Sequence, residues 1–499
     1  MFQETPGSPG VFFCYHILLE SILSLVFIAL IAAYIVVMPT VGIISDLSWH
    51  NDQRLAQITL LMVMAVNAAL SLTSARRFCV VPAWGLLSRY AWHALFAAFL
   101  FGAVSAAAAP LPRWAFVEWC LMVLLITLGV TVAAIRQPLG VKFDRLLIGV
   151  LLFTATAYLL KVCAGYTAAL VERLPIHIWW LLDGFSNPRF FGQFQTLTLP
   201  LLVLPAMFWA KSPLSRVSLT LIPILWWTLS IASGTRGTWL AMIVACAVIF
   251  LSARSNSYRW LKWQLGTLLA GLVAYGLFFF VLPSLMSAPV DTVNRLADIT
   301  NLSFRDVLWA RALDYIVAHP VLGIGPMHFA YYPNPVSAHP HMSLLQWAAE
   351  WGLPSALLVL SVVLHAGLSS ARQLRAIPSE GGAEAYTLQL ALFASLCAAA
   401  AQSLVDGVIV MPYSQTLLVV LGGWALSIHQ CDSPSKTVIV PVAQRIGTLV
   451  VALSAALLLW GVFPGIIEIV SGAEAFSANV IREGATLKPR FWSNGWIHD

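Results

Sequence analysis

Charged residues are scarce in this sequence. Asp, Glu, Lys and Arg together make up 10% of the 499 residues, whereas soluble domains carry about 25%. Another 60% of the chain is hydrophobic, so the composition excludes a soluble enzyme. Apolar stretches of about 20 residues, the length that crosses a bilayer, recur along the chain and predict an integral membrane protein.

Paired cysteines and basic runs are also missing. The seven cysteines lie singly, mostly inside apolar stretches, which argues against a disulfide framework or a zinc site. The net charge of +6 comes from basic residues in small groups at the ends of apolar stretches. The sequence has no basic stripe of the kind that would indicate nucleic acid as a partner. The first apolar run, at about 17–38, lacks a preceding basic segment and is too long for a signal peptide, so we expect a retained helix.

Long apolar stretches are what the sequence has in abundance. They lack the alternation of barrel strands, and in lipid each segment must satisfy its own backbone polar groups, so they predict α-helices. We therefore expect an all-α polytopic membrane protein with about 12 to 13 transmembrane helices. The stretches run at about 17–38, 55–74, 91–109, 114–135, 146–165, 196–210, 217–232, 237–253, 264–283, 343–368, 388–406, 414–428 and 446–469.

Lys and Arg gather in alternate loops between these stretches. Short loops rich in Lys and Arg stay in the cytoplasm, so the remaining loops are expected on the other side of the membrane. That side then holds residues 166–195, the turn at 233–237 and the long connection at 284–342. The cytoplasmic loops are marked by Arg76, Arg77, Arg89, Arg136, Lys142, Arg145, Lys211, Arg216, Arg254, Arg259, Lys262, Arg372, Arg375, Lys436 and Arg445.

The connection at 284–342 is much longer than helix packing requires, and long loops of this kind are usually functional. Within it, Ser303 and Asp306 form a capping-box-like start, and apolar residues then recur at helical spacing. This pattern predicts a short amphipathic helix at about 304–318, lying at the membrane surface. We expect nine helices in 1–283, an outward catalytic loop at 284–342, four helices in 343–469 and a short tail at 470–499.

A glycine-flanked arginine opens the eighth stretch. Residues 233–239 read S-G-T-R-G-T-W, so Arg236 falls in the first turn of a helix, where free N–H groups already favour an anion. A guanidinium in that position suits a phosphate. The alternative is an interfacial arginine whose side chain reaches the lipid head groups.

Arg305 takes a similar position at the start of the expected loop helix, with Trp309 one turn on and Arg311 about two turns on. Two helix starts that each carry an arginine on the same side of the membrane can clamp a pyrophosphate. The alternative is a surface charge paired with Asp306 or Asp314, and that alternative fits Arg311 better.

Two histidines lie just before the tenth stretch, in the sequence His339-Pro340-His341. Histidine titrates near neutral pH and accepts a proton from an attacking hydroxyl, so His341 is a candidate general base. Two histidines can also bind a metal, but no clustered carboxylates or further histidines complete such a site, and we expect no metal. Arg189, in another outward loop, is a secondary candidate for substrate contact, and nearby aromatics serve either as an interfacial belt or as sugar platforms.

Three of these motifs together resemble the O-antigen ligase superfamily. They are S-G-T-R-G-T-W-L, then R-D-V-L-W-A-R-A-L followed by H-P-V-L-G-I-G-P, then H-P-H followed by E-W-G-L, and they cover about residues 185–355. The superfamily includes O-antigen ligases, O-antigen polymerases and protein O-oligosaccharyltransferases. The sequence departs from the ligase pattern at Met342, which replaces a polar residue after His341, so Ser343 or His339 is expected to orient the imidazole.

The resemblance implies a metal-independent, inverting glycosyl transfer without a cofactor, from an undecaprenyl-diphosphate-linked glycan to a hydroxyl acceptor. The acceptor would be lipid A core, a polysaccharide or a protein such as a pilin, and the site would face the periplasm from the bacterial inner membrane. By position, Arg236 and Arg305 would hold the diphosphate, and His341 would act as the base or bind the diphosphate. Arg189, His339, Trp309 and Arg311 would contact substrate.

Two readings of other classes stay open. A non-enzymatic transporter of lipid-linked sugars would be expected to carry charges at the membrane midplane, which this sequence lacks. A scaffold within an envelope-assembly complex accounts for the hydrophobicity but gives no reason for two outward arginines at helix starts. The absence of a soluble repeat domain after the last helix favours a ligase over a protein-glycosylating relative.

Overall fold

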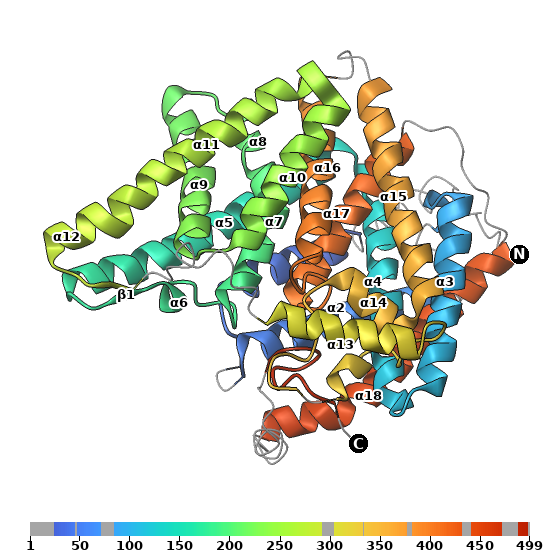
Figure 1. Cartoon of the computed structure of the whole chain (residues 1–499). Coiled ribbons are helices and arrows are strands. Elements are labelled where there is room, and N and C mark those ends of the chain that lie inside the picture. Colours follow the sequence, from blue (N-terminus) through green and yellow to red (C-terminus); the bar gives the residue numbers. More distant parts are fainter. Residues whose placement is uncertain are drawn as a thin grey trace, which may run out of the picture.

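The chain folds into a bundle of helices, of which ten in the described part are long and apolar enough to cross a membrane (Figure 1). This confirms the expected all-α polytopic membrane protein, and the described part of each apolar stretch is mostly helical. The computed structural model describes residues 24–44, 47–70, 84–291, 304–332, 334–376, 382–431, 441–471 and 488–497.

The first half contains the helix Ser24–Val37, α2 (Trp49–Leu70), α3 (Arg89–Ala108), α4 (Pro112–Leu139), α5 (Val141–Val171), α6 (Ile178–Leu181), α7 (Pro188–Leu202), α8 (Leu204–Phe208), α9 (Pro213–Ala232), α10 (Arg236–Ala253), α11 (Tyr258–Gly276) and α12 (Leu282–Met286). The second half contains α13 (Arg305–Ala318), α14 (Ser343–Trp351), α15 (Leu353–Ala376), α16 (Ala383–Ser403), α17 (Pro412–Cys431) and α18 (Pro441–Ser471). Short 3-10 or π turns cover Trp84–Leu86, Arg254–Ser257, Leu277–Val281 and His328–Ala330.

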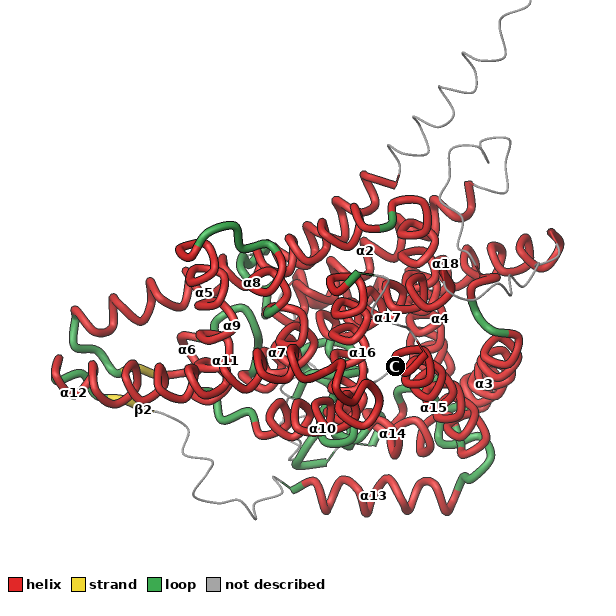
Figure 2. Tube along the Cα trace, turned by 90° about the horizontal axis from the view of Figure 1, so that it is seen from above, coloured by secondary structure: helices red, strands yellow, loops and turns green. Residues whose placement is uncertain are grey.

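The helices form a central bundle with an arm on one side. In the bundle, α17 packs on α4, α16 packs on α7 and α10, and α18 packs on α2 and α4. The arm consists of α5, α9, α11 and α12, and it extends away from the bundle in both views (Figures 1 and 2). Near its tip, β1 (Ile176–His177) pairs in parallel with β2 (Val290–Asp291), which joins two connections far apart in the sequence.

The helix α13 confirms the amphipathic helix expected at about 304–318. It runs crosswise to α15 and α17, over one end of the bundle (Figure 1). Its buried residues Leu308, Ala312 and Ile316 recur at helical spacing and pack against Phe329 and the small residues of α14. The proposed cap, Ser303, lies outside the described residues, and the helix begins after Phe304, whose φ is +58°.

The tenth apolar stretch is divided into α14 and α15 at Gly352. Its φ is +84°, a backbone conformation that L side chains rarely adopt. A Cβ atom there would lie 2.0 Å from the carbonyl oxygen of Val321, so only glycine permits this contact with the segment after α13. The bend therefore seats α14 beneath α13 and places the preceding His339–His341 loop at the end of the bundle.

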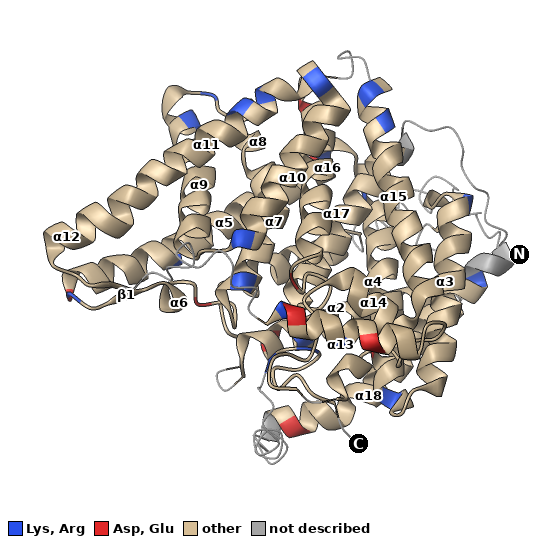
Figure 3. Ribbon diagram, in the orientation of Figure 1, with Lys and Arg blue, Asp and Glu red and all other residues tan. Residues whose placement is uncertain are grey.

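The two ends of the bundle differ in charge. Lys and Arg cluster at the upper ends of α9, α10, α11 and α15, while basic and acidic residues mix near α13 (Figure 3). Arg236 begins α10 and Arg254 directly follows it, so the two arginines lie at opposite ends of one helix. Among the described residues, the basic loops thus gather at one end, and the turn at 233–237 and α13 share the other, as the alternating charge pattern predicts.

Candidate functional site

A small cavity at the α13 end of the bundle brings together three arginines from distant parts of the chain. It has a volume of about 130 Å³ and is lined by Arg189, Arg236 and Arg305. Each lies in the first turn of a helix, because Arg189 is the second residue of α7, and Arg236 and Arg305 are the first residues of α10 and α13. The positive dipole ends of three helices therefore point to one region together with three guanidinium groups. The cavity is also lined by Gly234, Thr235, Gly237, Leu240, Gln402, Val405 and Asp406.

Close packing between α7 and α10 positions two of these arginines. A Cβ atom on Gly192 would lie 2.8 Å from the Cγ2 atom of Thr235, so glycine is required for the helices to approach this closely. The hydroxyl of Thr238 donates a hydrogen bond of 2.9 Å to the carbonyl of Gly192 and fixes the contact. At the start of α7, the side chain of Asn187 caps the helix by accepting from the backbone N–H of Arg189, at 2.9 Å.

The small cavity carries a surplus of positive charge. Asp406 is the one carboxylate among the described residues that line it, against three arginines. Burial lowers the pKa of Arg305, and the charges of Arg189 and Arg236 lower it further, while Asp406 opposes the effect. The Nε atom of Arg305 is buried and has no hydrogen-bond partner among the described residues. A bound anion would compensate this charge and supply the missing acceptor.

A second, larger cavity lies beside the first, and Arg189 lines both. Its volume is about 580 Å³. Three aromatic side chains line it, as do His339, His341 and Lys488, and no carboxylate is among its described lining residues. Its wall is completed by Ser48, Trp179, Ser186, Asn187, Phe190, Phe304, Pro335, Val336, Ser337, Pro489 and Ser493. Flat rings and hydrogen-bonding groups of this kind suit a sugar with an anionic substituent.

His341 connects the two cavities. It lines the larger one, and its Nδ1 atom lies 3.8 Å from the Oδ1 atom of Asp406, which lines the smaller one. That separation is too long for a hydrogen bond, so the contact is electrostatic. The backbone of His341 is held in a left-handed conformation with a φ of +53°, which is uncommon for a residue other than glycine.

His339 and Trp309 hold this histidine loop in place. The backbone N–H of His341 donates to the Nδ1 atom of His339 at 3.3 Å, and the two imidazole ring centres are 4.0 Å apart. The indole of Trp309, on α13, donates a hydrogen bond of 3.1 Å to the carbonyl of Pro340. Of the two residues expected to orient His341 in place of a polar neighbour, His339 makes this contact, whereas the Ser343 hydroxyl has no partner among the described residues.

The protonation states follow from burial and neighbouring charges. Burial lowers the pKa of His341, with Asp406 opposing this shift and Arg189 and Arg305 adding to it. Burial also raises the pKa of Asp406, but the interaction with His341, the hydrogen bond from the backbone N–H of Gly407 and the charge of Arg189 more than offset that effect and bring the pKa below its usual value. His341 is therefore neutral at neutral pH and faces an ionised carboxylate, which is the state required of a general base.

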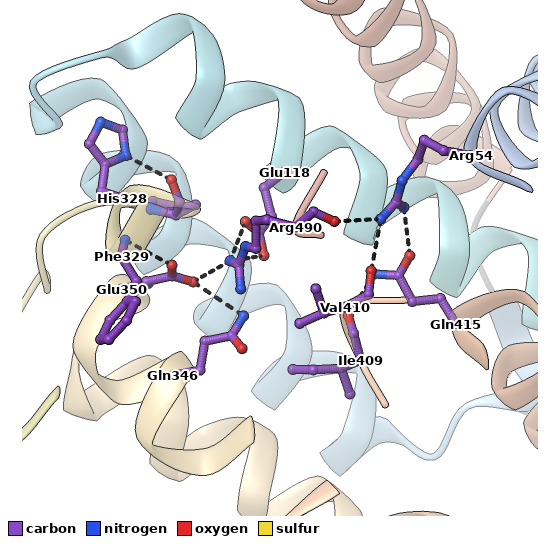
Figure 4. Close-up of polar contacts among 11 residues, drawn as sticks. Arg54, Glu118, His328, Phe329, Gln346, Glu350, Ile409, Val410, Gln415 and Arg490 are labelled. Carbon is purple, nitrogen blue, oxygen red and sulfur yellow. Dashed lines mark hydrogen bonds and ion pairs between the residues drawn. The ribbon is translucent and has the colours of Figure 1, made fainter. Parts of the chain in front are cut away.

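A buried ion cluster lies behind the histidine loop, and Figure 4 shows its contacts. The Nη2 atom of Arg490 lies 2.7 Å from Oε2 of Glu118 on α4 and 2.7 Å from Oε2 of Glu350 on α14. The other oxygen of Glu350 accepts from the backbone N–H of Phe329 at 3.0 Å. Burial raises the pKa of Glu350 to about 7, with Arg490 opposing the shift and Glu118 adding to it.

Sequence reasoning missed several of these residues. The sequence patterns single out none of Glu118, Glu350, Asp406 and Arg490 as site residues. An ionisable residue within an apolar segment is by itself a reason to expect a functional site, and that signal applied to Asp406. No local pattern marks Arg490, because its partners Glu118 and Glu350 lie 372 and 140 residues away in the sequence.

The structure places five of the seven predicted site residues in the walls of the two cavities. Arg189, Arg236 and Arg305 line the small cavity, and His339 and His341 line the large one. Trp309 contacts the histidine loop through the backbone of Pro340. Arg311 instead faces Tyr315, with its Nε atom 2.8 Å from the phenolic oxygen, and it lies outside both cavities.

A family model described as O-antigen ligase matches residues 221–360. No curated protein matches the chain. The matched segment contains Arg236, Arg305 and the histidine loop, and it leaves out Arg189, Asp406 and Arg490. The match over this segment supports membership of the O-antigen ligase superfamily, whose members are membrane glycosyltransferase-like enzymes.

Proposed function

We propose that this protein transfers a glycan from undecaprenyl diphosphate to a hydroxyl acceptor, with inversion and without a metal, at the periplasmic face of the bacterial inner membrane. The observation that carries the proposal is the convergence of Arg189, Arg236 and Arg305 beside His341. Three helix starts with three guanidinium groups suit a diphosphate, and an adjacent neutral histidine suits activation of a hydroxyl.

In this proposal the diphosphate of the donor occupies the small cavity. A diphosphate is the leaving group of the reaction, and negative charge builds on it as its bond to the sugar breaks. Arg236 and Arg305, together with Arg189, neutralise that charge at positions fixed by the starts of three helices. The sugar then extends into the larger cavity, where Phe190 and Trp179 offer flat apolar faces.

His341 acts as the general base in the same scheme. Its imidazole accepts the proton of the acceptor hydroxyl while the oxygen attacks the anomeric carbon from the face opposite the diphosphate. The bond between that carbon and the diphosphate oxygen breaks, and undecaprenyl diphosphate leaves. Asp406, 3.8 Å away, stabilises the imidazolium that forms, and His339 and Trp309 hold the loop. Each cycle ends when the imidazolium releases its proton.

The acceptor is lipid A core, another polysaccharide or a protein such as a pilin. These acceptors correspond to ligase, polymerase and protein O-oligosaccharyltransferase activities, which share one chemistry. The larger cavity bears cationic groups and no described carboxylate, which favours an acceptor or glycan with anionic substituents. Assaying the purified protein with each acceptor class and one lipid-linked donor separates the three.

The test is transfer by purified protein with Arg236→Ala, Arg305→Ala or His341→Ala. We expect each variant to lose transfer while its amount in the membrane stays normal. Matched controls are Arg216→Ala and His365→Ala, because both side chains are exposed and lie away from the cavities. Full transfer by all three site variants would refute the proposal.

The same assay distinguishes an enzyme from a transporter of lipid-linked sugars. A transferase releases undecaprenyl diphosphate in the same amount as the glycosylated product. A transporter leaves the bond between sugar and diphosphate intact, so undecaprenyl diphosphate would not appear, whichever acceptor is supplied.

A further inference from the structure

The segment 488–497 lies against the candidate site although it is far from the catalytic motifs in sequence. We propose that this segment is a wall of the substrate cavity, that Arg490 is the positioning residue that anchors it, and that Lys488 binds an anionic group of the glycan or the acceptor. The inference rests on the proposed function and extends it to residues outside the matched family segment.

Arg490 is the first anchor of this wall. It is 2% exposed, and a single guanidinium joins Glu118 on α4 to Glu350 on α14 (Figure 4). A buried cation between two buried carboxylates cannot be removed without leaving their charge uncompensated. The contact therefore fixes the segment to two helices that border the site.

Backbone contacts provide further anchors on both sides of Arg490. The buried guanidinium of Arg54, on α2, donates to the carbonyl of Phe491 at 3.1 Å. The backbone N–H of Ser493 donates to the side chain of Asn51 at 2.8 Å, and the Asn51 amide returns a hydrogen bond of 3.0 Å to the Ser493 hydroxyl. The N–H of Ile497 donates to the carbonyl of Ala330. The segment is thus held along its described length rather than at one point.

One face of the segment looks into the larger cavity. Lys488, Pro489 and Ser493 line that cavity together with His339 and His341. Lys488 is exposed, whereas Arg490 two residues on is buried, so the segment presents one cation to the cavity and uses the other for anchoring. Because the described lining has no carboxylate, the charge of Lys488 is available to an anionic ligand.

The segment also supports the histidine loop. A Cβ atom on Gly495 would lie 3.3 Å from the Cβ atom of Ala338, the residue before His339. Glu350, which Arg490 holds, fixes the backbone of Phe329 in the preceding connection. A displaced segment would therefore change both the shape of the cavity and the position of the base.

The first test concerns the contact with substrate. Transfer rates of Lys488→Ala are measured while donor and acceptor are varied in turn, with Lys211→Ala, an exposed lysine at the other end of the bundle, as the matched control. We expect KM for one substrate to rise roughly two- to fivefold, the range typical of an exposed charge contact, with little change in kcat. The substrate whose KM rises identifies the anionic partner, and the effect should be lost when the charged substituents on the sugars of that substrate are removed.

A second variant tests the wall itself. Ser493→Trp places a bulky ring in the cavity and should raise KM much more than Lys488→Ala. The inference would be overturned if Lys488→Ala and Ser493→Trp both left the kinetics unchanged while Arg236→Ala abolished transfer. If the unmodified protein transferred no glycan to any of the three acceptor classes, the proposed function itself would fail, so the two failures are distinguishable.

The third test concerns the anchor. The pair Asn51→Cys and Ser493→Cys reports the position of the segment through oxidative cross-linking, because the two side chains touch in the unmodified protein. Arg490→Ala should reduce this cross-linking and lower kcat, and Arg490→Lys should restore part of both. A triple variant with Glu118→Gln, Glu350→Gln and Arg490→Gln removes the buried charges together. A lower kcat in that variant therefore cannot be attributed to misfolding caused by uncompensated buried carboxylates. Equal cross-linking and equal kcat in the Arg490 variants would show that the residue does not position the wall.

Discussion

Arginine has two different environments at the two ends of this helix bundle. At the basic end, most arginines are dispersed and exposed: the side chain of Arg145 is 63% exposed, and its closest approach to Glu384 is 3.8 Å. Arg136 is the exception among the described residues of that end, because it is buried in an ion pair with Asp144. At the α13 end, three arginines share one small cavity and Arg490 is buried in an ion cluster. Exposed basic residues at one end are typical of those that orient helices in a membrane, whereas the three cavity arginines concentrate positive charge beside a single described carboxylate, Asp406.

The difference lies in what surrounds each arginine rather than in its place on the helix. Three exposed arginines of the basic end, Arg89, Arg216 and Arg259, also lie in first turns of helices. Arg189, Arg236 and Arg305 lie in first turns too, but they are half-buried and line one cavity, where the helix dipoles add to their charge. The charge of this second group is therefore concentrated at one place, whereas the charge of the first group is dispersed.

The largest effect on stability is expected from Arg490. Arg490→Ala should lower the free energy of unfolding by about 3 to 5 kcal/mol, because it leaves two buried carboxylates without their cation. Arg145→Ala, at the basic end, should lower it by at most about 1 kcal/mol. Chemical unfolding in detergent compares the two, and equal losses would contradict the proposed difference between the ends.

The next largest effect is expected on the chemical step. Arg236→Ala should reduce kcat roughly 100- to 1,000-fold, the usual cost of removing one group that stabilises a developing negative charge. Arg236→Lys should recover only part of this, because an ammonium cannot form a bidentate contact with a phosphate. Arg216→Ala should leave kcat unchanged. A similar loss in the Arg216 and Arg236 variants would show that both act through folding or orientation.

The pH dependence of transfer tests the state of His341. Its pKa is lowered chiefly by burial, so the imidazole is neutral, and competent as a base, throughout the range above its ordinary pKa. As pH falls, activity should persist below the usual histidine range and decline only when His341 becomes protonated. A decline that begins above the ordinary histidine pKa would indicate a raised rather than a lowered value. The kcat profile between about pH 4 and 8 decides this.

A smaller effect is expected from Trp309. Trp309→Phe removes the hydrogen bond to Pro340 but keeps an aromatic ring in place. The loss should cost about 0.5 to 1.5 kcal/mol, seen as a roughly two- to tenfold decrease in kcat with unchanged KM for the donor. If KM for the donor rose instead, Trp309 would contact substrate directly, as the sequence alone suggested.

Much of the fold and part of the site could be predicted from the sequence. Hydropathy located the helices, since the requirement to satisfy backbone groups in lipid leaves few alternatives. The charge pattern placed the turn before α10 and the helix α13 at the same end of the bundle, and both start with an arginine in the structure. The amphipathic spacing of Leu308, Ala312 and Ile316 was enough to predict α13.

The rest depends on contacts between distant segments. Asp406 reaches His341 only because α16 ends beside the histidine loop. Arg490 reaches Glu118 across most of the chain, and no periodicity encodes that distance. The tight packing of Gly192 on Thr235 is likewise visible only once α7 and α10 are side by side. Sequence patterns identified which elements meet at one end, but not which side chains complete the site.

The most direct measurement of the central claim is the binding of undecaprenyl diphosphate to purified protein in detergent. We predict that Arg236→Ala and Arg305→Ala each weaken binding at least about tenfold, while Arg216→Ala and Arg145→Ala, from the basic end, bind as the unmodified protein does. Equal binding by all five proteins would contradict the claim that the arginines at the α13 end hold the diphosphate.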